Sequence, residues 1–93
     1  MRSIGWTPKS LRAFKRVVKR NPQIRSVLEE TLRQLVEDPF QSGLQTHKLM
    51  GDLSGVWSCS VAYDLRILFE FVKSKEGEDS ILLLNIGSHD EVY

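Results

Sequence analysis

Apolar residues recur at helical spacing through the first third of the chain. The first stripe follows Thr7-Pro8, a dipeptide that suits an N-cap and the first helical position. A second stripe follows Asn21-Pro22 and ends before Pro39. The stripes consist of Leu11, Phe14, Val17 and Val18, and then of Ile24, Val27, Leu28, Thr31, Leu32 and Leu35. This spacing predicts two helices joined by a very short turn, as in an αα-hairpin.

From Val56 onward the hydrophobic period changes to two, which is typical of strands. A second alternating stretch covers residues 65–72, and the polar residues 73–79, with Gly77, predict a hairpin turn. The aliphatic run from Ile81 to Leu84 predicts a last strand, to residue 86, covered on both faces. Residues 2–6 are predicted to form a further short strand, and residues 40–55 are predicted to form a loop. The sequence therefore predicts an α+β fold in the order β-α-α-β-β-β, an antiparallel sheet with the helical hairpin packed on one face.

Length and composition narrow the class of protein. A chain of 93 residues with 41% hydrophobic and 27% charged residues predicts one globular domain, residues 1–93. No apolar run approaches the roughly 20 residues of a membrane helix, and no secretory signal is evident. Cys59 is the only cysteine, which excludes an internal disulfide, and one cysteine with two histidines makes a poor zinc site. We expect a cytoplasmic protein without metal or cofactor.

Charge is distributed very unevenly along the chain. Residues 1–28 contain eight of the 13 basic side chains and none of the 12 acidic ones. Such asymmetry indicates a polyanionic partner for the basic segment, although a solvated helix surface is the alternative. The basic residues that populate the first predicted helix beside its apolar stripe include Lys15, Arg16, Lys19 and Arg20.

Alternation along the first long strand predicts a small polar patch. Trp57, Cys59, Val61 and Tyr63 share the face expected to pack on the helices, so Ser58 and Ser60 face away from the core. A short turn near Tyr63-Asp64 would bring Asp64 and Arg66 to the same open face, unless a bulge reverses the parity. Cys59 is better explained as a small buried hydrophobe than as a nucleophile.

Two histidines could supply acid–base chemistry at such a patch. His47 precedes the strands and His89 follows the last one. RNA can be cleaved without a metal when the adjacent 2′-hydroxyl is the nucleophile, given a base, an acid for the leaving oxygen and a cation for the phosphate. Histidine serves either proton-transfer role near neutral pH, and arginine presents paired donors to phosphate. Tyr93 is a candidate for stacking on an unpaired base.

Three segments together resemble the RelE/YafQ toxins of bacterial toxin–antitoxin systems. They are His-Lys-Leu-Met-Gly-Asp-Leu-Ser-Gly-Val-Trp (47–57), Val-Ala-Tyr-Asp-Leu-Arg-Ile-Leu-Phe (61–69) and Ile-Gly-Ser-His-Asp-Glu-Val-Tyr (86–93). The resemblance spans the chain, and it implies the same fold and a metal-independent endoribonuclease that cuts mRNA on the ribosome. It also implies a cognate antitoxin that forms an inhibitory hetero-oligomer with the toxin.

The resemblance assigns roles to individual residues. His47, Asp64, His89 and Tyr93 occupy catalytic positions of the YafQ-like branch, and Arg66 fits the phosphate-binding arginine of RelE. Ser60 stands where the YafQ-like pattern has a histidine. We expect His89 to be the general acid and His47 or Asp64 the base. Residues expected to contact RNA are Lys15, Arg16, Lys19, Arg20, Lys48 and Ser60.

Two other functions fit the same fold. A ParE-like relative would inhibit DNA gyrase without nuclease activity, and an inactive homologue would only bind its antitoxin. The two histidines favour the nuclease, because a gyrase inhibitor needs no acid–base residues there. The serine at position 60, where the YafQ-like pattern has a histidine, keeps the inactive homologue as an alternative.

Overall fold

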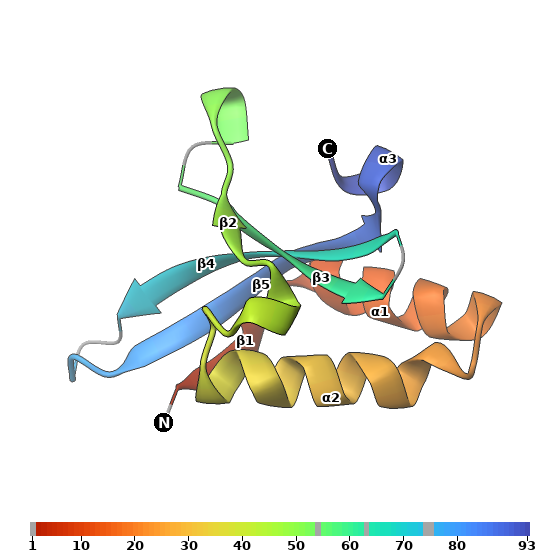
Figure 1. Ribbon diagram of the computed structural model, residues 1–93, viewed down its shortest axis with the longest axis horizontal. Coiled ribbons are helices and arrows are strands. Elements are labelled where there is room, and N and C mark those ends of the chain that lie inside the picture. The colour runs from red at the N-terminus through yellow and green to blue at the C-terminus, as the bar shows by residue number, and fades with distance from the viewer. Residues whose placement is uncertain (1, 54, 63, 74–75) are drawn as a thin grey trace.

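The computed structural model describes residues 2–53, 55–62, 64–73 and 76–93 and confirms the α+β architecture. Strand β1 (Ser3–Trp6) leads into helices α1 (Pro8–Arg20) and α2 (Ile24–Glu37) (Figure 1). The short strand β2 (His47–Lys48) follows, and then β3 (Trp57–Ala62), β4 (Leu65–Lys73) and β5 (Asp79–Ser88). A single helical turn, α3 (His89–Val92), ends the chain. Two 3₁₀ turns, 42–44 and 51–53, flank β2.

The helix boundaries follow local sequence signals at one helix and depart from them at the other. Thr7 caps α1 as predicted, since its side chain accepts a hydrogen bond from the Ser10 backbone N–H. The expected start of the second helix at Asn21-Pro22 is wrong. Asn21 instead ends α1 by donating its N–H to the carbonyl of Val17, and α2 begins at Ile24 without a side-chain cap. Asn21 and Pro22 therefore belong to the turn between the helices.

The five strands form one sheet in the order β1-β5-β4-β3-β2. All neighbours are antiparallel except β1, which runs parallel to β5. This pairing follows from the long connection from β1 to β5, since a strand that is not joined by a hairpin is free to pair in either direction. The predicted antiparallel hairpins are β3–β4 and β4–β5.

Alternate residues of the strands form the core beneath the helices. Cys59, Ile67 and Ile86 lie opposite one another in the register, as do Trp57, Phe69 and Leu83. They pack against apolar residues of the helical hairpin, chiefly Ala13, Leu28, Leu32 and Leu35. Trp57 is half-buried against this core as predicted, and Tyr63, expected on the same face, lies outside the described residues.

The last strand is covered less evenly than its aliphatic sequence predicts. Ile81, Leu83 and Ile86 are fully buried beneath the helices, whereas Leu82 and Leu84 are only half-buried on the opposite face. A register shift beside Leu84 separates the two parts of the strand. The face away from α1 and α2 is therefore partly open rather than covered by a second layer.

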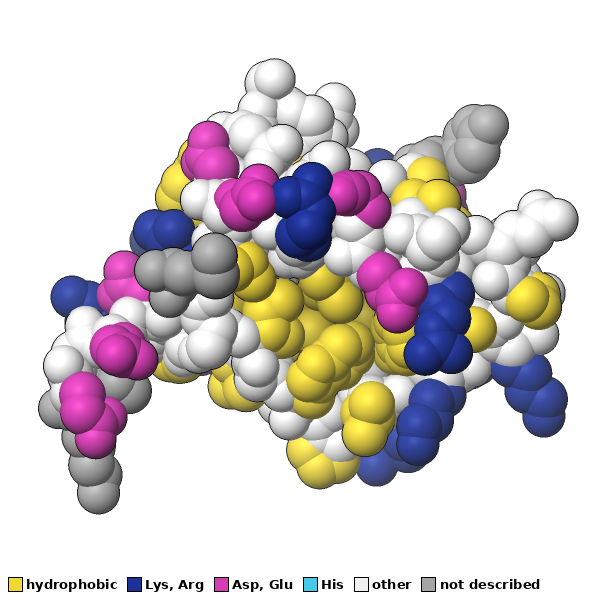
Figure 2. Space-filling view, turned by 90° about the horizontal axis from the view of Figure 1, so that it is seen from below, with side chains coloured by type: hydrophobic (Ala, Val, Ile, Leu, Met, Phe, Trp, Pro, Cys, Tyr) yellow, Lys and Arg dark blue, Asp and Glu magenta, His cyan; other side chains and the backbone are white. Residues whose placement is uncertain are grey.

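Both short elements that the sequence did not predict lie on this open side. In Figure 1, the β2 segment and α3 rise from the face of the sheet opposite to α1 and α2. Figure 2 shows the other side, where hydrophobic side chains gather between basic and acidic groups. Among the described residues, none of the helices combines the length and hydropathy that a membrane crossing requires.

Candidate active site

Strand register brings three of the predicted site residues to one face of the sheet. His47 lies opposite Ser58, and Ser60 lies opposite Arg66. Side chains at directly paired positions point to the same face, with Cβ atoms about 4.5–5.5 Å apart. Because Cys59 and Ile67 point into the helix-covered core, His47, Ser60 and Arg66 lie on the open face. Lys48 is paired with Trp57 and therefore lies on the opposite face, away from this group.

The imidazole of His47 is exposed and held in one orientation. Its Nδ1 lies 3.0 Å from the carbonyl oxygen of Gln45. A carbonyl only accepts hydrogen bonds, so Nδ1 carries the proton and Nε2 of the neutral ring keeps its lone pair. This tautomer leaves His47 Nε2 able to accept a proton from a substrate.

Gln45 connects His47 with the predicted RNA contact Ser60. Its Oε1 accepts a hydrogen bond of 3.2 Å from the Ser60 hydroxyl. The backbone of Gln45 is left-handed, with φ of 51°, which turns its carbonyl toward the ring of His47. Nothing in the sequence identified Gln45, since an isolated glutamine in a loop carries no signal for this conformation.

The guanidinium of Arg66 lies at the same face, on β4. Its Nη1 donates a 3.2 Å hydrogen bond to the carbonyl of Leu65, and the residue is half-buried. Arg66 is flanked in the register by Ser60 on β3 and by Gly87 on β5. An arginine side chain presents paired N–H donors of the kind that bind a phosphate group.

Helix α3 and the residue that follows it supply two further aromatic rings, those of His89 and Tyr93. The His89 and Tyr93 rings meet edge to face, with centroids 4.5 Å apart. The hydroxyl of Tyr93 forms a short hydrogen bond with the hydroxyl of Ser58. His89 is exposed, and its Nδ1 lies 3.6 Å from a carboxylate oxygen of Asp90. These contacts link Ser58, the β3 residue paired with His47, to the helix that holds His89.

The bond from Tyr93 corrects the expected position of Ser58. Alternation placed Ser58 on the open face, and the register agrees, but the residue is completely buried. The predicted strand parity is right, while the expected exposure is wrong, because α3 folds back over this part of the sheet. Of the two serines, Ser60 is the one that remains partly accessible.

Asp64 lies in the turn before β4, where the sequence predicted it. The register shifts between Ser60 and Ala62, and Asp64 lies in the turn that follows. Its Oδ1 accepts a 3.3 Å hydrogen bond from the backbone N–H of His89. Asp64 is thus next to the site, as predicted, and its observed contact fixes the first residue of α3.

Two residues that sequence reasoning overlooked shape α3. Ser88 accepts from the backbone N–H of Glu91, while the Glu91 carboxylate accepts from the N–H of Ser88 at 2.9 Å, which is a capping box. These bonds, with Arg20 3.3 Å away, lower the pKa of Glu91. A Cβ at Gly87 would lie 3.1 Å from Cβ of Glu91. The Ser-x-x-Glu spacing in the sequence is typical of a capping box and could have predicted this helical turn.

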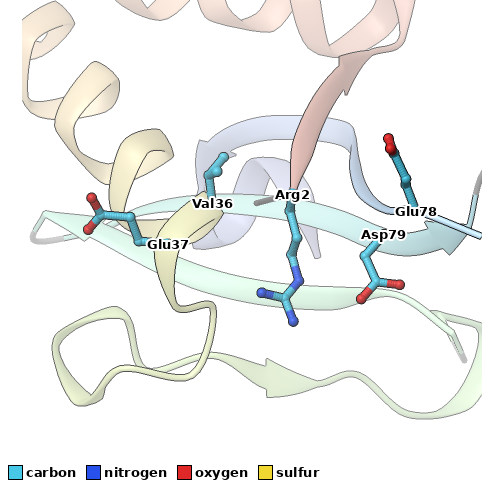
Figure 3. A pocket seen from close by; sticks show the side chains of 5 residues that line it. All are labelled: Arg2, Val36, Glu37, Glu78 and Asp79. Carbon is cyan, nitrogen blue, oxygen red and sulfur yellow. The ribbon is translucent and has the colours of Figure 1, made fainter.

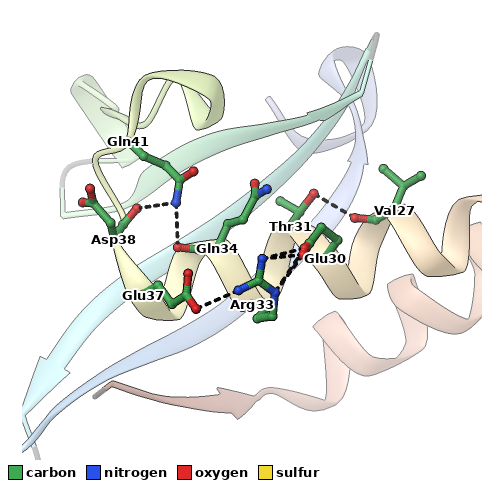
Figure 4. A network of polar contacts seen from close by, with 8 residues as sticks. All are labelled: Val27, Glu30, Thr31, Arg33, Gln34, Glu37, Asp38 and Gln41. Carbon is green, nitrogen blue, oxygen red and sulfur yellow. Dashed lines mark hydrogen bonds and ion pairs between the residues drawn. The ribbon is translucent and has the colours of Figure 1, made fainter.

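The basic surface of α1 is largely unneutralised, in contrast to that of α2. Among the described residues, no ion pair involves Lys15, Arg16 or Lys19, whereas Arg20 pairs with Glu91. On α2, Arg33 contacts both Glu30, at 2.6 Å, and Glu37, at 2.7 Å (Figure 4). The predicted cationic surface therefore exists on α1, and Arg20 joins it to the helix that bears His89.

The rest of the described chain offers few groups suited to catalysis. A pocket of about 550 Å³ is lined by Arg2, Val36, Glu37, Glu78 and Asp79 (Figure 3). It contains no histidine or hydroxyl nucleophile, and its charges have both signs. Burial raises the pKa of the Cys59 thiol to about 12, so it is not an activated nucleophile. The open face carries His47 and Arg66, and α3 with His89 lies against it through the bond between Tyr93 and Ser58.

Known proteins resemble this chain along its whole length. The family model described as a bacterial toxin of type II toxin–antitoxin systems, YafQ, matches residues 2–93. No curated protein matches. Among solved structures, YafQ from E. coli strain BL21(DE3) is 13% identical with a TM-score of 0.80, covering 100% of this chain and 99% of that one.

Two further structures have the same fold. A metal-bound toxin from Helicobacter pylori is 24% identical with a TM-score of 0.78 and complete coverage of both chains, 100% each. The toxin in an E. coli DinJ–YafQ complex is 15% identical with a TM-score of 0.79, covering 100% of this chain and 99% of that one. At these identities the structural similarity establishes the fold, and the family assignment depends on the model match.

Proposed function

The chain belongs to the YafQ family of toxins of type II toxin–antitoxin systems, and we propose that it is an endoribonuclease that cuts mRNA on the ribosome. The observation that carries this proposal is the series of contacts across the open face. His47 is paired with Ser58, which bonds to Tyr93, whose ring packs on His89. Two imidazoles and the guanidinium of Arg66 thus face one surface, the set that phosphodiester cleavage by a neighbouring hydroxyl requires.

In the proposed reaction the 2′-hydroxyl of the nucleotide before the cut is the nucleophile. Nε2 of His47 takes its proton while O2′ forms a bond to phosphorus. The bond from phosphorus to O5′ breaks, and protonated His89 gives a proton to the departing O5′. Arg66 neutralises the phosphate oxygens during the transfer. The products are a 2′,3′-cyclic phosphate and a free 5′-hydroxyl.

We assign the base to His47 rather than to Asp64. The bond from Gln45 leaves Nε2 of His47 with an available lone pair, whereas Asp64 already accepts a hydrogen bond from the His89 backbone. Ser60 stands in place of the family histidine, and its hydroxyl bonds to Gln45, the residue that orients His47. Ser60 would therefore support the base rather than transfer protons itself.

The partners follow from family membership and from surface charge. The solved DinJ–YafQ complexes pair a YafQ toxin with DinJ, and we extend this to a cognate antitoxin for the present chain. The unneutralised cations of α1 would contact ribosomal RNA phosphates beside the mRNA. Because Arg20 lies on the same helix and contacts Glu91, docking and catalysis would occur on adjoining surfaces.

Induction of the toxin, followed by primer extension on a translated mRNA, tests the proposal. We expect growth arrest and mRNA cuts in frame with codons. The cleavage products should end in a 2′,3′-cyclic phosphate or 3′-phosphate. They should form equally well with EDTA in a polyamine-stabilised ribosome complex. His89→Ala should abolish cleavage, while Glu76→Gln, at an exposed position between β4 and β5, should retain it. A 3′-hydroxyl product would indicate water as the nucleophile. Intact mRNA with arrested replication would favour gyrase inhibition.

A further inference from the structure

A second cavity opens on the same face as the proposed catalytic groups. It has a volume of about 350 Å³, and its walls come from the start of α1, from the loop before β3, from β4 and β5, and from α3. Its apolar lining includes Leu53, Leu68, Leu84 and Val92, while Lys9 and Asn85 supply polar groups. Binding sites for small ligands have this character, with mostly apolar walls and a few placed polar groups.

The strand register places this cavity beside the residues of the proposed active site. His47, Ser58, Leu68 and Asn85 are successive partners across four strands. The first two belong to the proposed active site, and the last two line the cavity. Val92, also in the wall, precedes Tyr93, whose hydroxyl bonds to Ser58. A nucleotide whose phosphate lies at Arg66 would therefore have a neighbouring nucleotide within reach of the cavity.

Asn85 gives the cavity a hydrogen-bonding group of fixed orientation. It is a half-buried amide that interrupts the aliphatic sequence of β5. Its Oδ1 accepts a 2.9 Å hydrogen bond from the Ile86 N–H, which directs Nδ2 the other way. Among the described residues, Nδ2 has no hydrogen-bond partner. Two N–H donors are thus available to an occupant, and leaving them unpaired in a filled cavity would be costly.

We propose that this cavity holds the base of an mRNA nucleotide next to the cleaved phosphate, and that Asn85 selects among bases there. This inference rests on the proposed nuclease function. The apolar walls would contact the faces of the base, and Nδ2 of Asn85 would donate to an acceptor on its edge. The exposed ammonium of Lys9 at the rim would contact a backbone phosphate. Selection then arises from the acceptor pattern of the base rather than from its size.

The decisive variant is Asn85→Asp. A carboxylate oxygen still accepts from the Ile86 N–H, and the side chain keeps its size, but the group facing the cavity changes from donor to acceptor. Bases that present only a hydrogen-bond acceptor at this position should lose cleavage rate relative to bases that present an N–H donor there. We expect the ratio of cleavage rates between these two classes to change about tenfold, the scale of one well-formed base contact. The readout is single-turnover cleavage of ribosome complexes that differ in one base near the cut.

Two comparators separate the effect of hydrogen bonding from that of charge. Asn21→Asp makes the same chemical change in the turn between α1 and α2, and it should leave base preference unaltered. Asn85→Leu removes the donors without adding charge, and it should flatten the preference. His89→Ala should lower cleavage of every base alike, so loss of the catalytic function is distinguishable from loss of base selection.

A binding measurement tests the cavity without catalysis. In the His89→Ala toxin, titration with each of the four nucleoside 5′-monophosphates should shift the side-chain amide resonances of Asn85, and to different extents. Unchanged resonances, or equal base preference in wild type, Asn85→Asp and Asn85→Leu, would overturn the proposal. It would also be overturned if the Asn85 variants lost only antitoxin binding, because the cavity would then belong to the protein partner.

Discussion

Replacing Gly87 by alanine should separate the position of α3 from the stability of the fold. A Cβ at this position would lie 3.1 Å from Cβ of Glu91, 3.2 Å from its Oε1 and 3.3 Å from Cγ1 of Val92. All three atoms belong to α3, the turn that carries His89 and Tyr93. The methyl group therefore pushes against the catalytic turn and not against the helix-covered core.

The expected loss of stability is small. Extra methyl groups in packed sites cost about 1–3 kcal/mol, while replacing glycine in a strand recovers about 0.5–1 kcal/mol. The net destabilisation is then on the order of 1 kcal/mol, or about 4–8 °C in Tm for a domain of this size. The turn is terminal and can move outward, which limits the cost further. Displacement of His89 by about 1 Å can nevertheless slow the reaction about 100-fold.

The assay measures cleavage and thermal unfolding on the same preparation. Gly43→Ala is the matched control, because a Cβ there would meet nothing within 4 Å. We expect Gly43→Ala to cleave like the wild type, and Gly87→Ala to cleave about 100-fold more slowly while its Tm falls by only about 4–8 °C. If Gly87→Ala cleaves at the wild-type rate while folded, the position of α3 does not control catalysis and the assignment of His89 fails.

Three further results are expected. Tyr93→Phe keeps the ring contact with His89 but leaves the buried Ser58 hydroxyl without its partner, which should cost about 1–3 kcal/mol in chemical denaturation. Reversing Lys15, Arg16 and Lys19 to Glu should weaken co-sedimentation with ribosomes and make binding less sensitive to added salt, whereas Lys73→Glu should change neither property. Folding lowers the pKa of Glu91, so the stabilisation from its ionised carboxylate is complete above the ordinary Glu pKa of about 4.3 and is lost as pH falls through the lower folded value. The Tyr93 ring resonances should therefore report release of α3 only in that acidic range. Glu91→Gln should remove the transition.

The sequence predicts well those elements whose apolar pattern extends over several residues. Both helices and the three long strands have such patterns, and the structure contains all five. Their core faces follow from periodicity because burial of many side chains outweighs any local preference. The start of α2 was misplaced for the complementary reason. Pro22 is compatible with either a helix start or a turn, and no capping side chain decides between them.

Elements of two to four residues could not be obtained in the same way. Strand β2 contains only His47 and Lys48, and it exists because it pairs with the start of β3. Helix α3 is one turn, too short to be stable alone, and its contacts with Ser58, Asp64 and Arg20 hold it on the sheet. The capping box at Ser88 was visible in the sequence, but the partners of the turn are distant along the chain.

The difference between long and short elements explains why the candidate residues were easier to predict than their surroundings. His47 and His89 lie on short elements, β2 and α3, whereas Arg66 lies on a long central strand. These short elements are held by a few hydrogen bonds, such as that between the His47 ring and the Gln45 carbonyl and that from the His89 backbone N–H to Asp64, and not by a packed layer. Such elements can open locally at little cost in free energy while the core stays folded. A partner that displaces α3 would therefore stop the proposed cleavage without unfolding the toxin, which is the behaviour that reversible inhibition by an antitoxin requires.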